Sequence, residues 1–310
     1  MTNHSASDPA ALDTVSVCVC TYKRPAPLLR LLHALENQQT GGCFAYSIVV
    51  VDNDREGSAR AVVERFAAGS ALAVAYEIQP EQNISLTRNR AVALTDGGLV
   101  AMVDDDEFPR ANWLLEMYRT LQTHGADGVL GPVLPHFAVT PPGWVLKGRF
   151  CERRSFATGT VLRDPLHTRT GNVMIRRTSL LAESGPFDPR YGRTGGEDVD
   201  FFRRRLAGGD RFVWCDEAPV FENVPPERLT RGYFLRRALM RGVANADRVS
   251  VFSGEMVKST VAVLAYSTVV LPLLLVRHDL FMHTLIRDCD HLGKVLAVLG
   301  IRLVHQRGQD

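Results

Sequence analysis

The paired cysteine spacing of a structural zinc site is missing from this 310-residue chain. None of its six cysteines stands in a Cys-x-x-Cys arrangement, which excludes a site of that kind. Two of them alternate with valines at residues 17–20, so we expect them to line one face of a buried strand. This cysteine usage is typical of a reducing compartment. The cysteines are Cys18, Cys20, Cys43, Cys151, Cys215 and Cys289.

A large excess of charge of one sign is also missing. The formal net charge is +2, from 36 Lys and Arg against 34 Asp and Glu, which argues against a dedicated nucleic-acid binder. Residues 1–14 are polar and lack the charged start and apolar core of a signal peptide, so no export is indicated and a disordered N-terminus is expected. The length allows one large domain with an appendage, or two modest domains.

Acidic side chains, by contrast, gather at one point of the chain. The apolar run of residues 99–103 is followed by Asp104, Asp105 and Asp106, and Glu107 adds a fourth carboxylate. Because carboxylates repel one another, a fold that groups them at the end of a strand is expected to hold a compensating cation there. The alternative is a solvated acidic turn before a helix that begins near Pro109.

Strand and helix patterns alternate through the first hundred residues. Strands are predicted at residues 15–20, 47–51, 73–78 and 99–103, with helices from Pro25 and over 84–94. This order implies parallel βαβ units, whose loops meet at one edge of a sheet. Hydroxyl, basic and acidic groups at that edge suit a base, a ribose and a diphosphate. They are Thr21, Tyr22, Lys23, Arg24, Asp52, Asn53, Asp54, Arg88 and Asn89.

A second acidic group follows a predicted strand at residues 172–176. Gly195 and Gly196 form a flexible turn, and Glu197, Asp198 and Asp200 then lead into a predicted helix. Carboxylates are stabilised at a helix N-terminus, so Glu197 and Asp198 either carry chemistry or merely cap that helix. Residues 134–170 between the two acidic groups are rich in Pro and Gly and are expected to form loops.

Seven short elements stand in a characteristic order along residues 15–245: 17–25, 50–54, 87–90, 104–107, 131–133, 171–173 and 195–198. In this order they resemble the inverting family 2 glycosyltransferases, and within them the succinoglycan-type β-glucosyltransferases of bacterial exopolysaccharide assembly. Each element is weak alone. The resemblance implies an α/β fold of the GT-A type over residues 15–245, with a Rossmann-like nucleotide-binding half fused to an acceptor-binding half.

The resemblance also implies a nucleotide-diphosphate sugar donor, commonly a UDP-sugar, and a divalent metal, Mn or Mg. Asp106 and Asp104 would hold the metal through the DxD motif, and Asp198 would be the catalytic base. Glu197, Trp144 and Asn172 are placed on the acceptor side. The donor-binding set is Thr21, Tyr22, Arg24, Asp52, Asp54, Arg88, Asp104 and Asp105.

A single in-line displacement needs two such acidic sites. A carboxylate accepts the proton of the attacking hydroxyl, while a metal offsets charge on the departing diphosphate. One departure from the family pattern leaves the nucleotide contacts of its loop open: residues 84–89 read Ile-Ser-Leu-Thr-Arg-Asn, where a Gly-Leu pair usually precedes Ala-Arg-Asn.

Other interpretations remain open. His136 is a further candidate metal ligand, and Trp113 and Trp214 are candidates for sugar stacking, although core packing is the default for each. A phosphohydrolase using the DxD motif would need a following Ser/Thr loop, which Glu107 and Pro109 do not supply. A sugar nucleotidyltransferase would need a Gly-rich loop after the first strand. A catalytically inactive sugar-nucleotide-binding scaffold of a glycan assembly complex is the non-enzymatic alternative.

The C-terminal region, residues 246–310, is predicted to be helical and apolar. Residues 259–276 carry no charge and lie between Lys258 and Arg277, a length at the lower limit for a membrane span. A re-entrant or interfacial helix, a span and a buried core helix are the three alternatives. A second apolar stripe lies at residues 292–299.

A membrane partner follows from the resemblance, which implies a lipid-linked or oligosaccharide acceptor. The apolar extension would hold the enzyme at the cytoplasmic face of the bacterial inner membrane. Arginines at 228–241, with Arg237 and Arg241 on one helical face, would then meet a diphosphate or anionic lipids; the alternative is a solvated helix face.

Overall fold

The computed structural model describes residues 12–193, 195–246 and 249–301. Two compact units make up the chain: residues up to 134 with 153–222, and residues 135–152 with 223 onward. This division differs from the predicted boundary at residue 245, because the helix before that residue packs with the C-terminal helices. Of the predicted disordered N-terminus, 1–11 lies outside the described residues, whereas Asp13 and Thr14 already belong to a strand. Residues 302–310 of the predicted helical extension also lie outside them.

The first unit is built on a mixed eight-stranded sheet in the order β3-β2-β1-β4-β9-β6-β10-β8. The four strands predicted from the N-terminal half are present and parallel, while β9 runs antiparallel to both β4 and β6. The strands are β1 (Asp13–Thr21), β2 (Phe44–Asp52), β3 (Val74–Ile78), β4 (Leu99–Asp104), β6 (Gly128–Leu130), β8 (Val161–Leu162), β9 (Asn172–Arg176) and β10 (Phe212–Trp214).

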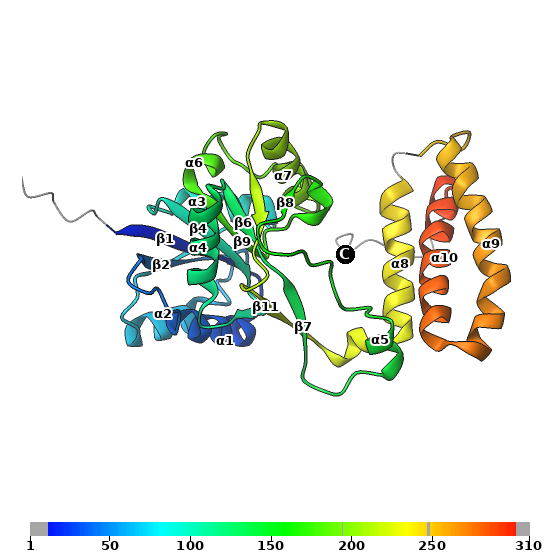
Figure 1. Ribbon diagram of the computed structural model, residues 1–310, viewed down its shortest axis with the longest axis horizontal. Coiled ribbons are helices and arrows are strands. Elements are labelled where there is room, and N and C mark those ends of the chain that lie inside the picture. Colours follow the sequence, from blue (N-terminus) through cyan, green and yellow to red (C-terminus); the bar gives the residue numbers. More distant parts are fainter. Residues whose placement is uncertain (1–11, 194, 247–248, 302–310) are drawn as a thin grey trace, which may run out of the picture. The chain divides into compact units, whose positions relative to one another are not determined.

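Helices cover both faces of this sheet (Figure 1). Alternate strand residues point to opposite faces, so β1 sends Val17 and Val19 into one apolar core and Cys18 into the other. The first core includes α1 (Pro25–Glu36), α2 (Arg60–Gly69) and α4 (Trp113–His124). The second includes α3 (Ile84–Ala93), α6 (Arg177–Leu180) and α7 (Glu197–Ala207). Asn83, the residue before α3, caps this helix by accepting the Leu86 amide.

A smaller sheet has the order β5-β11-β7, with β5 (Glu107–Pro109), β7 (Val133–Phe137) and β11 (Val220–Val224). β5 pairs antiparallel with β11, so Glu107 stands opposite Glu222. The alternative of a helix beginning near Pro109 is therefore wrong: a short strand occupies these residues, and α4 begins at Trp113. Short helices complete the chain at α5 (Gly143–Lys147), η1 (Pro165–His167), η2 (Pro189–Tyr191) and η3 (Pro226–Leu229).

The second unit contains α8 (Arg231–Ala246), α9 (Gly254–Val276) and α10 (His278–Val298). Within the described ranges, α9 is the one helix long and apolar enough to cross a membrane, and only 6% of its most apolar window is buried. The alternative of a buried core helix is therefore wrong for this segment. Its buried side chains are Met256, Ser259 and Val270, whereas Leu271 and Leu275 are 69% and 89% exposed.

Candidate active site

The carboxyl ends of three neighbouring parallel strands meet at one edge of the large sheet. β1 pairs with β2 so that Thr21 stands beside Asp52, and with β4 so that Cys20 stands beside Asp104. The three loops that follow these strands therefore lie together, as predicted. Open α/β sheets bind ligands at this edge.

The loop after β1 is fastened to the acidic loop after β4. Thr21 Oγ1 donates a hydrogen bond to Asp105 Oδ2 (2.8 Å). Arg24 Nη1 lies 3.0 Å from Asp105 Oδ1 and 2.8 Å from Asp106 Oδ2. The two loops thus form one polar surface on which a half-exposed guanidinium faces two carboxylates.

The tip of the first loop is exposed. Tyr22 is 38% exposed, and the Lys23 ammonium lies 5.3 Å from the centre of its ring. Lys23 has φ +54°, a left-handed backbone conformation uncommon for a residue with a side chain. Such a conformation persists only where surrounding contacts hold it, and the ion pairs of the next residue, Arg24, fix this loop.

Burial raises the pKa values of two carboxylates in the acidic loop. The pKa of Asp104 reaches about 6, since desolvation and the charges of Asp106 and Asp105 outweigh the attraction of Arg88. Burial raises the pKa of Glu107 well above its usual range, and the Asp104 charge adds to the effect. In their ionised form these neighbouring carboxylates repel one another, and a nearby cation would relieve this repulsion.

The donor set suits a divalent metal that also binds substrate phosphates. In the described part of the chain, no group of three or more His, Cys, Asp or Glu side chains forms a ready metal cage. Mg²⁺ is commonly bound by one or two carboxylates together with phosphate oxygens and water. Asp104 and Asp106, whose side chains are 49% and 22% exposed, offer such carboxylates at the surface. These two residues therefore fit the implied metal.

Arg88 on α3 links the two acidic groups. Its guanidinium pairs with Glu197 Oε1, and Nη2 lies 3.8 Å from Asp104 Oδ1. Although burial acts in the opposite direction, these carboxylates raise the pKa of Arg88, and Asp198 adds to them. The buried Glu197 Oε2 has no hydrogen-bond partner among the described residues. The acidic groups that lie ninety residues apart in the sequence thus face one arginine, whose side chain is only 12% exposed.

Asp198 lies in the first turn of α7, next to Glu197. Its Oδ1 accepts the backbone amide of Val199 (2.8 Å), which orients the carboxylate. Gly196 before the helix has φ +96° and Gly195 has φ +81°, so the turn needs glycines at both positions. The predicted helix N-terminus is therefore present, with both acids in its first turn.

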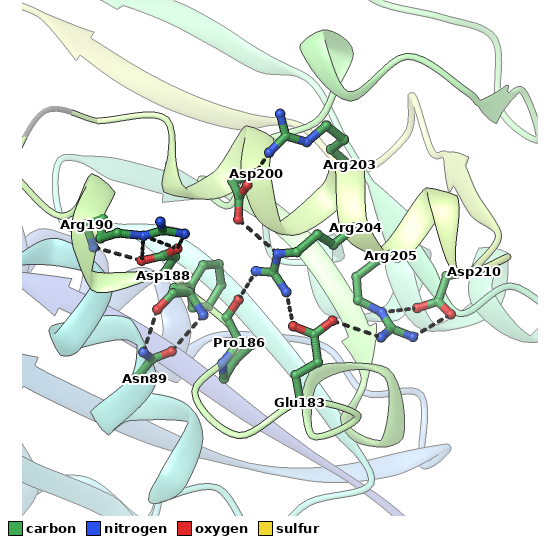
Figure 2. Close-up of polar contacts among 11 residues, drawn as sticks. Asn89, Glu183, Pro186, Asp188, Arg190, Asp200, Arg203, Arg204, Arg205 and Asp210 are labelled. Atoms are coloured by element: carbon green, nitrogen blue, oxygen red, sulfur yellow. Dashed lines mark hydrogen bonds and ion pairs between the residues drawn. The ribbon is translucent and has the colours of Figure 1, made fainter.

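Figure 2 shows the polar contacts that fix α7 to the chain before it. Arg204 binds Asp200 on its own helix, Glu183 and the Pro186 carbonyl. Asn89, next to Arg88 on α3, exchanges two hydrogen bonds with the backbone of the same loop (2.7 and 2.9 Å). The network therefore holds in place the helices that carry Arg88 and Asp198.

Asp52 is fully buried and organises its own loop. Its carboxylate accepts the amides of Asp54 (2.9 Å) and Ala59 (2.8 Å) and the Tyr76 hydroxyl (3.0 Å). Asn53, which the sequence analysis placed at the ligand-binding edge, donates to two carbonyls of the loop before α3 and accepts an amide from it. Direct donor contact by Asp52 or the buried Asp54 remains a prediction, and in this structure Asp52 acts through the loop it shapes.

The side chain of Asn172 likewise forms its hydrogen bonds within the protein. The Trp113 indole donates to its Oδ1 (2.8 Å), and its Nδ2 donates to the carbonyls of Pro132 and Ala218 (2.9 Å each). Trp113 is fully buried, so core packing is confirmed for it. The acceptor-side role of Asn172 stays a prediction, and its visible role is to join β9 to its neighbours.

Two predicted residues belong to the second unit. Trp144 packs there against Phe150, Phe234 and His278, with ring centres 5.4–5.9 Å apart. His136 lies on β7 in the same unit. Their roles as an acceptor contact and as a metal ligand stay predictions.

Arg153 is a neighbour of the site that no sequence pattern indicated. It pairs with Glu222, and its positive charge lowers the pKa values of Asp104 and Glu107, which partly offsets their rise. Only the pairing of β5 with β11 brings these residues together, and no spacing in the sequence relates them.

The comparisons with known proteins agree with this geometry. Residues 16–185, more than half of the chain, match the family described as Glycosyl transferase family 2. The chain belongs to glycosyltransferase family 2. Among curated proteins, it is 34% identical over 234 residues to the succinoglycan biosynthesis protein ExoM of Rhizobium meliloti, covering 74% of this chain and 72% of that protein.

Solved structures show that this family 2 chain has the GT-A fold. A mannosyltransferase from Pyrobaculum calidifontis, in complex with GDP-Man and Mn²⁺, aligns with a TM-score of 0.61 at 18% identity, over 94% of this chain and 89% of that one. The S. aureus TarS 1-349 structure in complex with UDP aligns with a TM-score of 0.54 at 17% identity, over 93% and 90% of the two chains.

Proposed function

We propose that this glycosyltransferase moves a hexose from a nucleotide-diphosphate sugar, commonly a UDP-sugar, to a glycan acceptor by an inverting single displacement. One observation carries the proposal. Arg88 connects the acidic loop after β4 with the acidic first turn of α7, so two carboxylate sites face one part of the sheet edge. The reaction needs two such sites with different tasks.

Each site has a distinct task in this mechanism. Thr21, Arg24 and Arg88 bind and orient the nucleotide end of the donor at the sheet edge. Asp104 and Asp106 would hold a divalent metal, Mn or Mg, which when bound offsets negative charge on the departing diphosphate. Asp198 accepts the proton of the acceptor hydroxyl as it attacks the anomeric carbon. Glu197 keeps Arg88 in place beside that carboxylate.

A donor screen tests this function. The full chain is incubated with a panel of UDP- and GDP-sugars, with Mn²⁺, with Mg²⁺ or with EDTA, and nucleotide release is measured. We expect metal-dependent release from one donor and faster release with acceptor. Donor binding without any turnover would instead favour the inactive scaffold, and absence of nucleotide-sugar binding would contradict both.

We further propose that the enzyme works in exopolysaccharide or cell-surface glycan synthesis at the cytoplasmic face of a bacterial inner membrane. The similarity to ExoM supports a role in exopolysaccharide synthesis. A lipid-linked or oligosaccharide acceptor suits such a process. The exposed apolar face of α9 supports the location, because a row of leucines and valines facing water is unfavourable and a lipid surface would cover it.

The second unit favours an in-plane orientation of α9 over a span. α9 is bonded to α10 along its length, through Ser259 to His291 (3.2 Å) and Ser267 to Asp288 (3.1 Å). α10 also carries Arg287 and Asp290. A spanning α9 would draw these charges into hydrocarbon, at about 2.5–3.5 kcal/mol for each charge at the bilayer centre. An α9 lying in the interface immerses only its outer leucine face.

Labelling from one side of the membrane tests this orientation. Cysteine is introduced at Glu255 or at Arg277, the two ends of α9, and sealed inside-out vesicles are treated with an impermeant maleimide. An in-plane helix exposes both ends to the reagent, whereas a spanning helix exposes one. Full-length protein that stays soluble at low salt without detergent contradicts the membrane proposal itself.

A further inference from the structure

A pocket lined by basic side chains lies in the first unit, apart from the donor-binding residues described above. Arg153, Arg154, His167 and Arg169 line it, and no Asp or Glu does. Trp214 forms another part of the wall. Arg153 is already ion-paired with Glu222, but the guanidinium groups of three arginines lie at one pocket whose wall holds no carboxylate, and this arrangement favours the binding of an anion.

Aromatic packing holds one guanidinium of this pocket in place. The Arg154 guanidinium lies 4.9 Å from the centre of the Phe156 ring, and its Nη1 lies 3.2 Å from His167 Nε2. Phe156 in turn packs edge-on against Trp214, with ring centres 5.4 Å apart. Arg154 has no carboxylate partner in the described part of the chain, so its charge is available to a ligand.

The pocket adjoins the acidic loop. Its wall includes Asn172, which pairs in the sheet with Val103, the residue before Asp104. At Gly171 a Cβ atom would come within 2.9 Å of Asp104 Oδ2, so this strand end packs directly against the proposed metal-binding carboxylate. Arg153 lines the pocket and also interacts electrostatically with Asp104 of the acidic loop.

We propose that this pocket binds an anionic group, a phosphate or a carboxylate, carried by the sugar acceptor. Guanidinium groups form strong paired hydrogen bonds with both anions. The inference rests on the proposed function, which assigns the donor diphosphate to the loops after β1 and β4. It goes further by naming the acceptor as an acidic sugar or a sugar phosphate.

Binding measured with the donor site already filled tests this assignment on the full chain. With UDP and Mn²⁺ present at saturation to fill the donor site, calorimetry measures binding of glucose 1-phosphate, glucuronic acid and glucose. We expect at least one anionic sugar to bind about tenfold more tightly than glucose, the size of one charge-assisted hydrogen bond. Preference for glucose 1-phosphate identifies a phosphorylated acceptor, and preference for glucuronic acid identifies an acidic sugar. Equal binding of all three overturns the proposal.

Two variants locate the binding. Arg154→Gln is expected to remove the anionic preference, while Arg163→Gln, the same change at an exposed position of the same segment, leaves it intact. Unchanged preference in Arg154→Gln overturns the proposal. If Arg154→Gln instead alters the discrimination between UDP-glucuronic acid and UDP-glucose, the anion belongs to the donor and the acceptor assignment fails. Wild-type protein that does not bind UDP at all contradicts the proposed function instead.

Discussion

The helices α7 and α9 differ in where their apolar side chains lie: the phenylalanines of α7 are buried, and many of the apolar side chains of α9 are exposed. In the first unit, α7 buries Phe201 and Phe202 against the sheet and keeps its arginines in polar contacts at the surface. In the second unit, α9 buries Ser259 completely and leaves Leu275 89% exposed. α7 follows the pattern of a helix in water. α9 has the reverse pattern, which indicates that its outer face meets something other than water.

The same contrast separates their polar groups. Those of the first unit converge on a sheet edge, where carboxylates and arginines face each other in an open polar surface. Those of α9 and α10 lie between the helices, as in the hydrogen bond from Ser267 to Asp288. The proposed function assigns chemistry to the first unit and membrane attachment to the second, and each side of this comparison can be tested separately.

The largest effect is expected at the proposed catalytic base of the first unit. Asp198→Asn removes the proton acceptor while keeping the side-chain size, so turnover should fall by roughly 100-fold or more, the usual size of a general-base contribution. Single-turnover kinetics with the donor identified by the screen measure this loss. Donor affinity should stay near the wild-type value, since the base does not hold the nucleotide. Near-normal transfer would move the role to Glu197.

Removal of the buried amide at the end of β9 should destabilise the first unit. Asn172→Ala leaves the Trp113 indole N–H without its acceptor and deletes two hydrogen bonds to carbonyls, so the free energy of unfolding should fall by about 2 kcal/mol. Urea unfolding followed by tryptophan fluorescence measures it. Asn37→Ala, at the exposed end of α1, is the matched control and should change stability by a few tenths of a kcal/mol, about the cost of a surface substitution. Equal effects of the two variants would contradict the structural role of Asn172.

A moderate effect is expected at the carboxylates proposed to bind the metal. Asp106→Asn removes one metal-facing charge, and the nucleotide-sugar affinity measured by calorimetry with Mn²⁺ should drop about tenfold, a loss near 1.4 kcal/mol. In EDTA the variant and the wild type should bind alike. Asp164→Asn, which alters an exposed carboxylate of the same unit, should have no effect. An affinity of Asp106→Asn that matches the wild type in Mn²⁺ would contradict the assignment.

The smallest effect is expected on the attachment side. Leu275→Ser removes one exposed leucine from the outer face of α9, so partitioning onto anionic lipid vesicles should weaken about fivefold, as expected for partial immersion of one such side chain. Vesicle co-sedimentation measures the partitioning. Leu181→Ser removes a 46% exposed leucine of the first unit and should leave it unchanged. Equal weakening by both changes would mean that vesicle binding does not depend on the α9 face.

The sequence itself determined the parts of the molecule that depend on local pattern. Short apolar runs that alternate with a helical pattern predicted β1 to β4, because runs of five or six residues rich in Val and Ile and bounded by polar residues favour buried strands over helices. Strands that run parallel end at one edge, so the meeting of Thr21, Asp52 and Asp104 followed from order alone. The acidic turn before α7 was also predictable, since its glycines and carboxylates are local signals.

Only the tertiary structure decided which polar groups serve the fold and which face a ligand. Asp52 and Asn172 stand in motif positions, yet both are occupied within the fold. Asp52 accepts two amides of its own loop and the Tyr76 hydroxyl, and Asn172 bonds the Trp113 indole and two distant carbonyls. Arg153 joins the acidic loop through a strand pairing that spans more than a hundred residues. Apolar residues 259–276 were visible in the sequence, but their exposed side was not, because burial depends on which partner helix covers which face. Long-range contacts of this kind leave no signal in local spacing.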